Sequence, residues 1–262
     1  MWPTLQLGSW QVGTYLVFAA LGLIVAAQYA LGRALSLGYS LEVVALGVLL
    51  TVGGAFIGVF VLQALITGLR IAWVSPLAPP EGLSIIGGLL GGAIVLAPYA
   101  RHHRASLAQV ADVALLPAPL GLAIGRLGCL AAGCCYGKPT DSWLGMYLPD
   151  DYGFWAVRYP TQLLSGVANL LIFLVLLAVE RYGLRRADET HGGRIWPFDG
   201  FLALLFMSLY ALKRFVIGFL RESAVPEIGP LSLMHFQAAV ALAAALALLA
   251  WNMRRMRKEK SA

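Results

Sequence analysis

The chain has 262 residues, of which 60% are hydrophobic and 12% are charged, and its formal net charge is +6. An average soluble domain carries about 25% charged residues, so this composition excludes an ordinary water-soluble protein and indicates an integral membrane protein. The positive charge does not indicate nucleic-acid binding, because the basic residues are sorted among loops and form no basic face or known binding motif.

Seven apolar runs are each long enough to cross a bilayer core, which takes about 18 to 25 residues. In chain order they are 12–31, 41–66, 82–100, 110–130, 161–179, 196–220 and 231–251. The third run is short and rich in glycine, and the first lacks the basic flank of a cleaved signal peptide. We therefore expect an all-α membrane protein with seven transmembrane helices in a single domain, 1–262.

The distribution of basic residues predicts the orientation. With the N-terminus in the periplasm, 12 of the 19 Lys and Arg residues fall in cytoplasmic loops and in a basic tail at 252–262. Lys and Arg generally accumulate on the cytoplasmic side. We expect a protein of the bacterial cytoplasmic (inner) membrane, with a small periplasmic region at 138–160 whose aromatic residues suit the headgroup level.

Prolines and glycines interrupt three of the runs. The interruptions are Pro117 and Pro119 in the fourth run, and glycine pairs at Gly53, Gly87 and Gly91 in the second and third. Small residues let membrane helices approach closely, and a broken helix is tolerated only where it packs on protein or lines a wet cavity. We expect these positions to be packing contacts.

Two arginines inside the predicted membrane region require a partner, because a charge in the bilayer is costly unless it is paired or faces a cavity. Arg126 and Arg214 fall in the outer halves of two runs that contain no acidic residue to neutralise both. Guanidinium groups suit phosphate oxygens, and phospholipid headgroups are the abundant anions at that depth. We predict a phospholipid-binding site there, whereas Arg158 and Arg221 can snorkel to the surface.

All three cysteines, Cys129, Cys134 and Cys135, fall in the stretch GRLGCLAAGCCYG at 125–137. They form neither a four-ligand zinc pattern nor a C-x-x-C pair, and we expect no metal and no cofactor. Three interpretations remain open. The cysteines are small buried hydrophobic residues, or Cys129 forms a disulfide with either neighbour, or one thiol is made reactive by Arg126.

One histidine is predicted near the arginines. His235 opens the last run on its outer side, where it either approaches the site or serves as a polar residue at a helix end. His102, His103 and His191 fall in predicted cytoplasmic loops, and we expect them to be solvated.

Six motifs, in this order, resemble those of one known family. They are TGLRI at 67–71, GLSIIGG at 82–88, QVADVALLPAPLGLAIGRLG at 109–128, GCCYGKPTD at 133–141, YPTQL at 159–163 and YALKRFVIGFLRE at 210–222. The chain resembles the bacterial prolipoprotein diacylglyceryl transferases over most of its length. Members of that family move the diacylglyceryl group of phosphatidylglycerol to the thiol of a lipobox cysteine in a secreted precursor, and release glycerol phosphate.

The resemblance implies roles for individual residues. Arg126 and Arg214 match arginines expected to hold the donor phosphate, and Tyr210, which shares a helical face with Arg214, is expected to orient the donor. The other residues expected to bind substrate are Arg70, Arg221, Gly128, Gly133, Gly137, Tyr159, Gln162, Cys129, Cys134 and His235. The implied partners of a monomeric enzyme are phosphatidylglycerol, or a similar anionic phospholipid, and a lipobox-containing preprolipoprotein.

The chain departs from the family pattern where the family carries groups that transfer protons. Ile86 stands in place of a histidine proposed to activate the acceptor thiol, and Gly218 in place of a glutamate. Cys129 and Cys134 stand in place of an asparagine and a glutamate, and Tyr159 in place of a histidine. The groups that bind the anion are kept, while those that handle protons are replaced.

Several functions therefore stay open beside the transferase. The remaining candidates for proton transfer are Tyr159, Tyr210, His235 or a cysteine. The same fold could use a different acceptor, in one version with a cluster cysteine as a transient lipid carrier, or it could bind phospholipid without catalysis. A retinal protein is disfavoured because the last run has no deep lysine.

Overall fold

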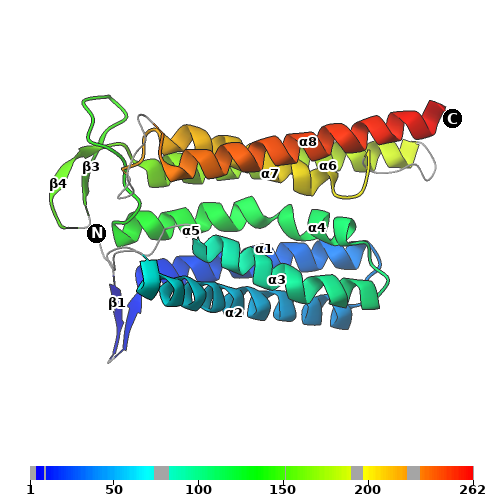
Figure 1. The fold of residues 1–262 in the computed structure, drawn as a ribbon, viewed down its shortest axis with the longest axis horizontal. Helices are drawn as coiled ribbons and strands as arrows, with labels where there is room; N and C mark the ends of the chain where they lie inside the picture. The colour runs from blue at the N-terminus through cyan, green and yellow to red at the C-terminus, as the bar shows by residue number, and fades with distance from the viewer. Residues whose placement is uncertain are drawn as a thin grey trace. The chain divides into compact units, whose positions relative to one another are not determined.

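Helices account for most of the chain (Figure 1). The computed structural model describes residues 4–8, 10–73, 83–150, 152–189, 197–222 and 231–261. The helices are α1 (Thr14–Ser36), α2 (Leu41–Trp73), α3 (Leu83–His102), α4 (Leu107–Leu115), α5 (Ala118–Ala132), α6 (Thr161–Glu189), α7 (Phe201–Gly218) and α8 (Leu233–Ser261). The strands are β1 (Thr4–Leu7), β2 (Trp10–Gly13), β3 (Met146–Pro149) and β4 (Trp155–Arg158).

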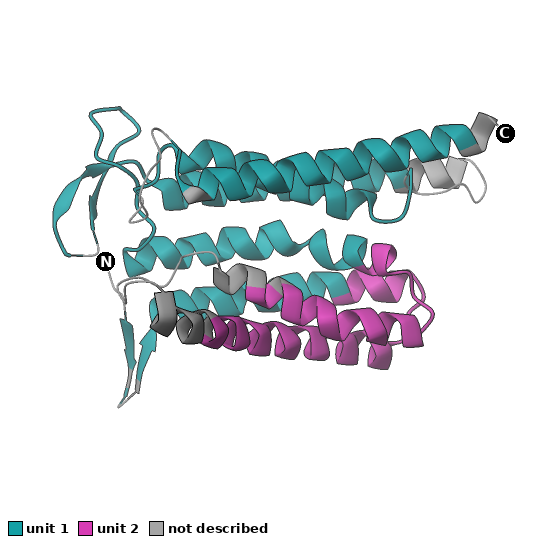
Figure 2. Ribbon diagram, viewed as in Figure 1, with its two compact units in different colours: residues 1–30, 111–262 teal, residues 31–110 magenta. Residues whose placement is uncertain are grey.

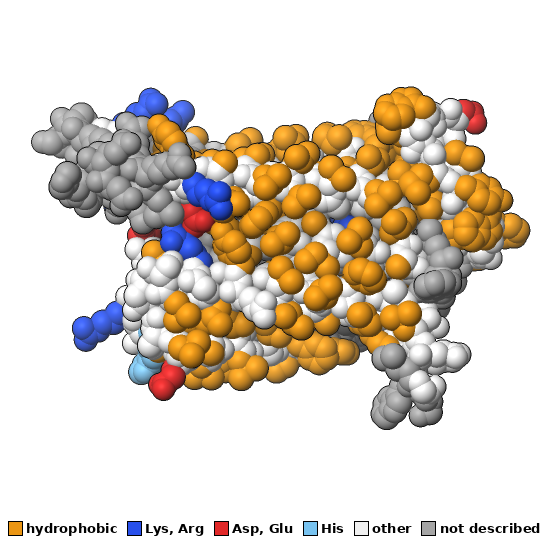
Figure 3. Space-filling view, turned by 180° about the vertical axis from the view of Figure 1, so that it is seen from behind, with side chains coloured by type: hydrophobic (Ala, Val, Ile, Leu, Met, Phe, Trp, Pro, Cys, Tyr) orange, Lys and Arg blue, Asp and Glu red, His pale blue; other side chains and the backbone are white. Residues whose placement is uncertain are grey.

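Six of the described stretches are long and apolar enough to cross a membrane. They are Thr14–Ser36, Leu41–Leu62, Leu107–Ala132, Thr161–Gly183, Phe201–Gly218 and Met234–Lys258. The apolar run at 82–100 forms α3, which is not among these six. Apolar side chains are spread over the long face visible in Figure 3. The protein is therefore a mostly helical, multi-pass membrane protein.

Two short antiparallel hairpins accompany the helices of this mostly helical fold. β1 pairs with β2, and β3 pairs with β4 within the region 138–160. The turn between β3 and β4 forms because the Asp150 carboxylate accepts hydrogen bonds from the backbone N–H groups of Tyr152 and Phe154, both at 2.9 Å. Such local side-chain bonds favour turns over helix.

The chain divides into two units, residues 1–30 with 111–262, and residues 31–110 (Figure 2). In the second unit α2 packs on α3, and the contact is made by Gly54, Gly58, Gly87 and Gly91. A Cβ at any of these four would collide with the backbone of the other helix. The predicted packing is confirmed at Gly87 and Gly91, but Gly53 faces open space, because its neighbour Gly54 occupies the contact.

In the first unit α5 packs on α6, α6 on α7, and α7 on α8. The buried core of this unit consists of Leu116, Ile172, Phe173, Leu176, Leu202 and Phe206. α1 packs against α5, where Gly22 lies on Gly121 with no room for a Cβ on either residue. These contacts bring the helices that carry the conspicuous polar residues side by side.

The predicted interruption in the fourth apolar run separates α4 from α5. Pro117 precedes the first turn of α5, and both Pro117 and Pro119 are fully buried against protein. Asp112 of α4 is also buried and accepts hydrogen bonds from the backbone N–H groups of Gly200 (2.7 Å) and Ala203 (2.8 Å) at the start of α7. Because Gly200 has no side chain, Asp112 supplies the cap that this helix lacks.

Candidate functional site

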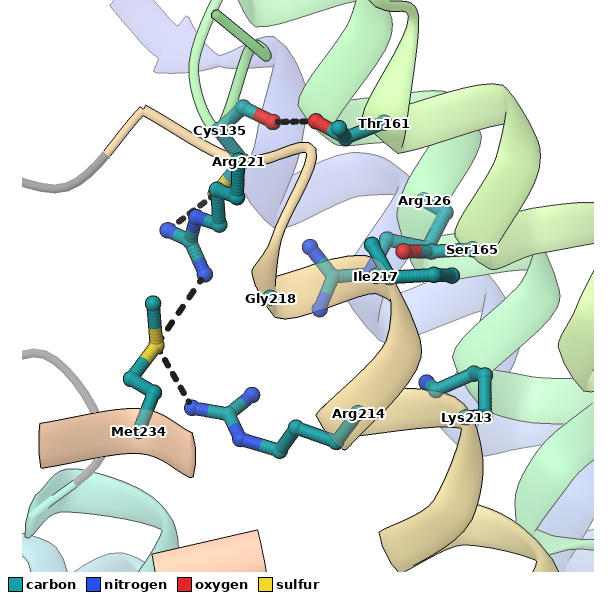
Figure 4. A pocket seen from close by; sticks show the side chains of 10 residues that line it. All are labelled: Arg126, Cys135, Thr161, Ser165, Lys213, Arg214, Ile217, Gly218, Arg221 and Met234. Atoms are coloured by element: carbon teal, nitrogen blue, oxygen red, sulfur yellow. Dashed lines mark hydrogen bonds between the residues drawn. The ribbon is translucent and has the colours of Figure 1, made fainter. Parts of the chain in front are cut away.

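A pocket lies in the first unit and is lined by residues of α5, α6, α7 and α8 (Figure 4). Four basic residues line it: Arg126 of α5, Lys213 and Arg214 of α7, and Arg221 just after α7. None of the described lining residues is acidic. The structure thus brings Arg126 and Arg214 to one cavity, whose charge suits an anion.

Met234 of α8 separates two of the arginines. Its sulfur accepts hydrogen bonds from Nη2 of Arg214 (3.4 Å) and from Nη1 of Arg221 (3.9 Å) (Figure 4). A thioether is only a weak acceptor. Met234 therefore holds both guanidinium groups in place without neutralising either charge.

Lys213 is a pocket residue whose place in the site was not predicted from the sequence. Its Nζ donates a hydrogen bond to Oδ1 of Asn169 (2.9 Å) and lies 4.0 Å from the centre of the Tyr210 ring. Tyr210 does not itself line the pocket. The tyrosine predicted to orient the donor contacts the lysine next to Arg214.

The end of α5 explains why the cysteines converge. Gly133 ends the helix with a φ of 80°, and the N–H groups of Gly133 and Cys134 bond back to the carbonyls of Leu130 (3.2 Å) and Cys129 (3.1 Å). This Schellman motif brings together the side chains at the positions of Cys129 and Cys134. Glycine adopts the left-handed conformation at little cost, so Gly133 is the residue that makes the motif favourable.

The three sulfur atoms of Cys129, Cys134 and Cys135 all lie within 4.8 Å of one another. No disulfide links them. Cys135 completes the group with an unusual φ of 61°, and it is the cysteine that lines the pocket. The spacing of the cysteines in the sequence had not suggested that all three would form one cluster.

Two side chains of α6 hold the backbone of the cysteine cluster in place. Oγ1 of Thr161 donates a hydrogen bond to the Cys135 carbonyl (2.6 Å; Figure 4), and Nε2 of Gln162 donates one to the Cys134 carbonyl (2.9 Å). Both side chains are almost fully buried. Gln162, predicted to bind substrate, thus contacts the cysteine loop instead of lining the pocket.

Two arginines contact the cluster. Nη1 of Arg126 lies 3.9 Å from the sulfur of Cys129, and Nη2 of Arg221 lies 3.4 Å from that of Cys135. The pKa of the Cys135 thiol is lowered by hydrogen bonds with the other two thiols and then by the positive charges of Arg221 and Arg126. The pKa of the Cys134 thiol is raised by its hydrogen bonds with Cys129 and Cys135. Of these two thiols, the one in the pocket wall is the more easily ionised.

The glycines expected to bind substrate have packing roles. A Cβ at Gly128 would lie 2.6 Å from Cβ of Phe18 in α1. One at Gly137 would lie 2.5 Å from the Tyr159 carbonyl oxygen and 2.7 Å from that of Leu220. The Gly137 N–H also donates to the Tyr159 carbonyl (3.0 Å). These glycines, like Gly133 at the end of α5, shape the backbone around the pocket.

Arg158 does not snorkel, contrary to the expectation. It is buried, and its guanidinium pairs with Asp150 (3.0 Å) and with Glu222. A buried charge of this kind needs such partners. The pairing ties the β3–β4 hairpin to the residues that follow α7. Arg221, the other arginine expected to snorkel, lines the pocket.

His235 lies behind the pocket wall. It is buried, its Nδ1 accepts a hydrogen bond from the Ser232 N–H (3.0 Å), and its ring centre is 4.3 Å from that of Phe219. A Cβ at Gly218, which does line the pocket, would lie 2.8 Å from Nε2 of His235. The imidazole therefore fills the space that a side chain at position 218 would need.

Three positions singled out in the sequence cannot be placed at the side-chain level. The side chains of Arg70 in α2 and Ile86 in α3, and the whole of His191, lie outside the described part of the structure. Their roles stay predictions.

Sequence comparisons identify the family. The profile of the prolipoprotein diacylglyceryl transferases matches residues 3–251. The phosphatidylglycerol–prolipoprotein diacylglyceryl transferase 2 of Clostridium perfringens is 27% identical over 259 residues, 95% of this chain and 94% of that protein. The corresponding transferase of Dehalococcoides mccartyi is 37% identical over 141 residues, which cover 54% of this chain and 50% of that protein. The transferase of Symbiobacterium thermophilum is 33% identical over 183 residues, which cover 66% of this chain and 62% of that protein. The chain belongs to the prolipoprotein diacylglyceryl transferase family.

Proposed function

We propose that this member of the family transfers the diacylglyceryl group of phosphatidylglycerol to a cysteine thiol of a prolipoprotein and releases glycerol phosphate. The observation that carries the proposal is the pocket lined by Arg126, Lys213, Arg214 and Arg221 without a described acidic residue. The three arginines keep this cavity charged, so in a membrane protein it needs an anion, and the donor lipid brings one phosphate. The relatives are named for the same reaction.

The arginines act on the leaving group. In the reaction the acceptor sulfur attacks the glyceryl carbon next to the phosphate, the carbon–oxygen bond breaks, and the phosphate leaves with an additional negative charge. Arg126 and Arg214 hold the phosphate and stabilise this charge as it develops. Arg221 adds positive potential at the same cavity.

The proposed topology has seven transmembrane helices, with α3 among them, an N-terminus in the periplasm and a C-terminus in the cytoplasm. The basic residues near the end of α8 favour a cytoplasmic C-terminus. The pocket and the β3–β4 hairpin then belong to the periplasmic half of a bacterial inner-membrane protein. There a secreted precursor reaches a monomeric enzyme.

Replacing the arginines tests the proposal. We expect Arg126→Ala and Arg214→Ala each to slow transfer by about a hundredfold or more, because each removes a group that stabilises the transition state. The measurement follows labelled phosphatidylglycerol onto a lipobox peptide with purified protein in detergent. Arg254→Ala, an exposed arginine of α8, is the matched control and should transfer normally. Unchanged transfer by the Arg126 variant would contradict the assignment.

A phospholipid-binding protein without transferase activity is the second candidate. It is favoured by Ile86, which occupies the position where relatives are expected to carry a histidine. It predicts that the purified protein retains phospholipid in the pocket but releases no glycerol phosphate from any donor. Glycerol phosphate release that depends on Arg126 would exclude it.

A further inference from the structure

The three cysteine sulfurs have nearly the geometry of a metal site. They lie within 4.8 Å of one another and include every cysteine of the chain. Zinc–sulfur bonds of about 2.3 Å in tetrahedral geometry place ligand sulfurs about 3.8 Å apart. Small rotations of the side chains would therefore bring all three sulfurs to bonding distance of one ion.

The backbone around the sulfurs is already fixed. The Schellman motif at Gly133 sets Cys129 beside Cys134, and Thr161 and Gln162 hold the carbonyls of the two later cysteines. Cys135 keeps a φ of 61°, which non-glycine residues rarely adopt and which is found where the surroundings enforce it, often at functional sites. Three small hydrophobic residues would need none of these restraints.

The nearby arginines are compatible with a bound cation. A divalent zinc ion with three thiolates carries a net charge of −1, so the complete site is an anion. Arg126 and Arg221 direct N–H groups at the sulfurs of Cys129 and Cys135. Hydrogen bonds of this kind to ligand atoms orient and stabilise metal sites.

We propose that Cys129, Cys134 and Cys135 bind one Zn²⁺ through their thiolates and leave its fourth position open towards the pocket. Catalytic zinc sites characteristically have three protein ligands and one open position. Cys135 lines the pocket, so an ion bound to its sulfur would lie at the wall of the cavity that also contains Arg126, Arg214 and Arg221. The fourth ligand of the ion is a thiol. This last step rests on the proposed function: in the transferase, the thiol is that of the acceptor cysteine of the prolipoprotein.

The zinc ion deprotonates the acceptor thiol, which is the task of the family residues that this chain has replaced. A thiol that coordinates zinc is deprotonated and gives its proton to water, so Ile86 can stand where relatives have a base. The bound thiolate attacks the glyceryl carbon, a carbon–sulfur bond forms, and the carbon–oxygen bond breaks with its electron pair on the departing phosphate. The product is a neutral thioether, a weak ligand that leaves the ion. Zinc is neither oxidised nor reduced.

The same chemistry disfavours a cysteine of the cluster as a lipid carrier. A diacylglyceryl group on Cys135 would be held by a thioether, and the thiolate that must leave for onward transfer is a far poorer leaving group from carbon than a phosphate. The cysteines are thus better suited to bind a metal than to form a covalent intermediate.

Metal binding is tested on the full-length protein, purified in detergent with a tag that contains no histidine. After reduction and incubation with zinc chloride, elemental analysis should find one zinc per chain. Cys129→Ser, Cys134→Ser and Cys135→Ser should each bind zinc at least tenfold more weakly. Arg214→Ala is the matched control and should keep the ion while it loses transfer. Cobalt in place of zinc should give a thiolate-to-metal absorption band.

The outcomes separate this inference from the proposed function. Removal of zinc from the wild-type protein with a chelator should abolish transfer, and zinc should restore it, which avoids any variant that fails to fold. Wild-type protein that binds neither zinc nor cobalt would overturn the site. Equal transfer with and without zinc would overturn the acceptor role. Zinc binding by a protein that modifies no lipobox peptide would leave the metal site standing and count against the proposed transferase.

Discussion

The backbone of Gly137 helps to position the residues that form the pocket. It forms an isolated bridge with Arg221, while its N–H donates to the Tyr159 carbonyl. The residues after the cysteines are thereby held between the start of α6 and the end of α7. The pocket arginine that follows α7 takes its backbone position from this bridge.

We expect Gly137→Ala to lower both stability and transfer. The added Cβ would meet two carbonyl oxygens at 2.5 and 2.7 Å, and overpacking of this kind costs about 1–3 kcal/mol. Thermal unfolding in detergent measures the loss. Gly125→Ala is the matched control, because a Cβ there meets nothing within 4 Å and alanine favours the helix. A Gly137→Ala protein that unfolds at the wild-type temperature would show that the backbone can yield.

At the scale of whole elements, the start of α7 depends on a residue from another helix. Asp112 of α4 accepts the N–H groups of Gly200 and Ala203. This contact fixes the residue at which α7 begins. It thereby sets the position of Lys213 and Arg214 along the helix axis relative to the pocket.

Replacement of Asp112 by alanine should destabilise the protein by about 1–3 kcal/mol, because two buried N–H groups would lose their acceptor. Transfer should fall as well, since α7 carries the pocket cations. Unfolding temperature and transfer rate can be measured on the same preparation. Asp141→Ala, at an exposed position between α5 and β3, should change neither. An Asp112 variant with unaltered stability would mean that water replaces the carboxylate.

The cysteine cluster could have been predicted from the sequence by considering the end of the helix. A glycine such as Gly133 after an apolar helical run is a typical C-terminal signal, and the Schellman motif it allows pairs positions 129 and 134. Spacing rules for metal ligands do not contain this information. The position of Cys135 depends on Thr161 and Arg221, which are distant in the chain, and so it needed the structure.

For the whole molecule, the apolar runs predicted the long helices well, because a bilayer demands continuous helix of a given length. The interruption at Pro117 was also predicted, since proline has no N–H to continue the ladder. The hairpins were missed because each strand has only four residues, which is too few to show a recognisable alternation of polar and apolar side chains. Lys213 was missed as a site residue because its role depends on Asn169 in a different helix.

The proposed topology predicts the location of the C-terminus. A fluorescent protein fused after residue 262 should fold and fluoresce in the cytoplasm, whereas alkaline phosphatase fused there should be inactive. Fusions after Asp141 should behave in the opposite way, because the region 138–160 is predicted to be periplasmic. Active phosphatase at the C-terminus would reverse the orientation.

The pocket draws its walls from α5, α6, α7 and finally α8, which contributes Met234 close to the end of the chain. During synthesis α8 emerges after the three helices that form the other walls, and it enters the membrane after them. A growing chain therefore carries three arginines and a lysine towards one site before the helix that closes it has been made. Until α8 packs on α7, the pocket that we propose for the donor phosphate is incomplete.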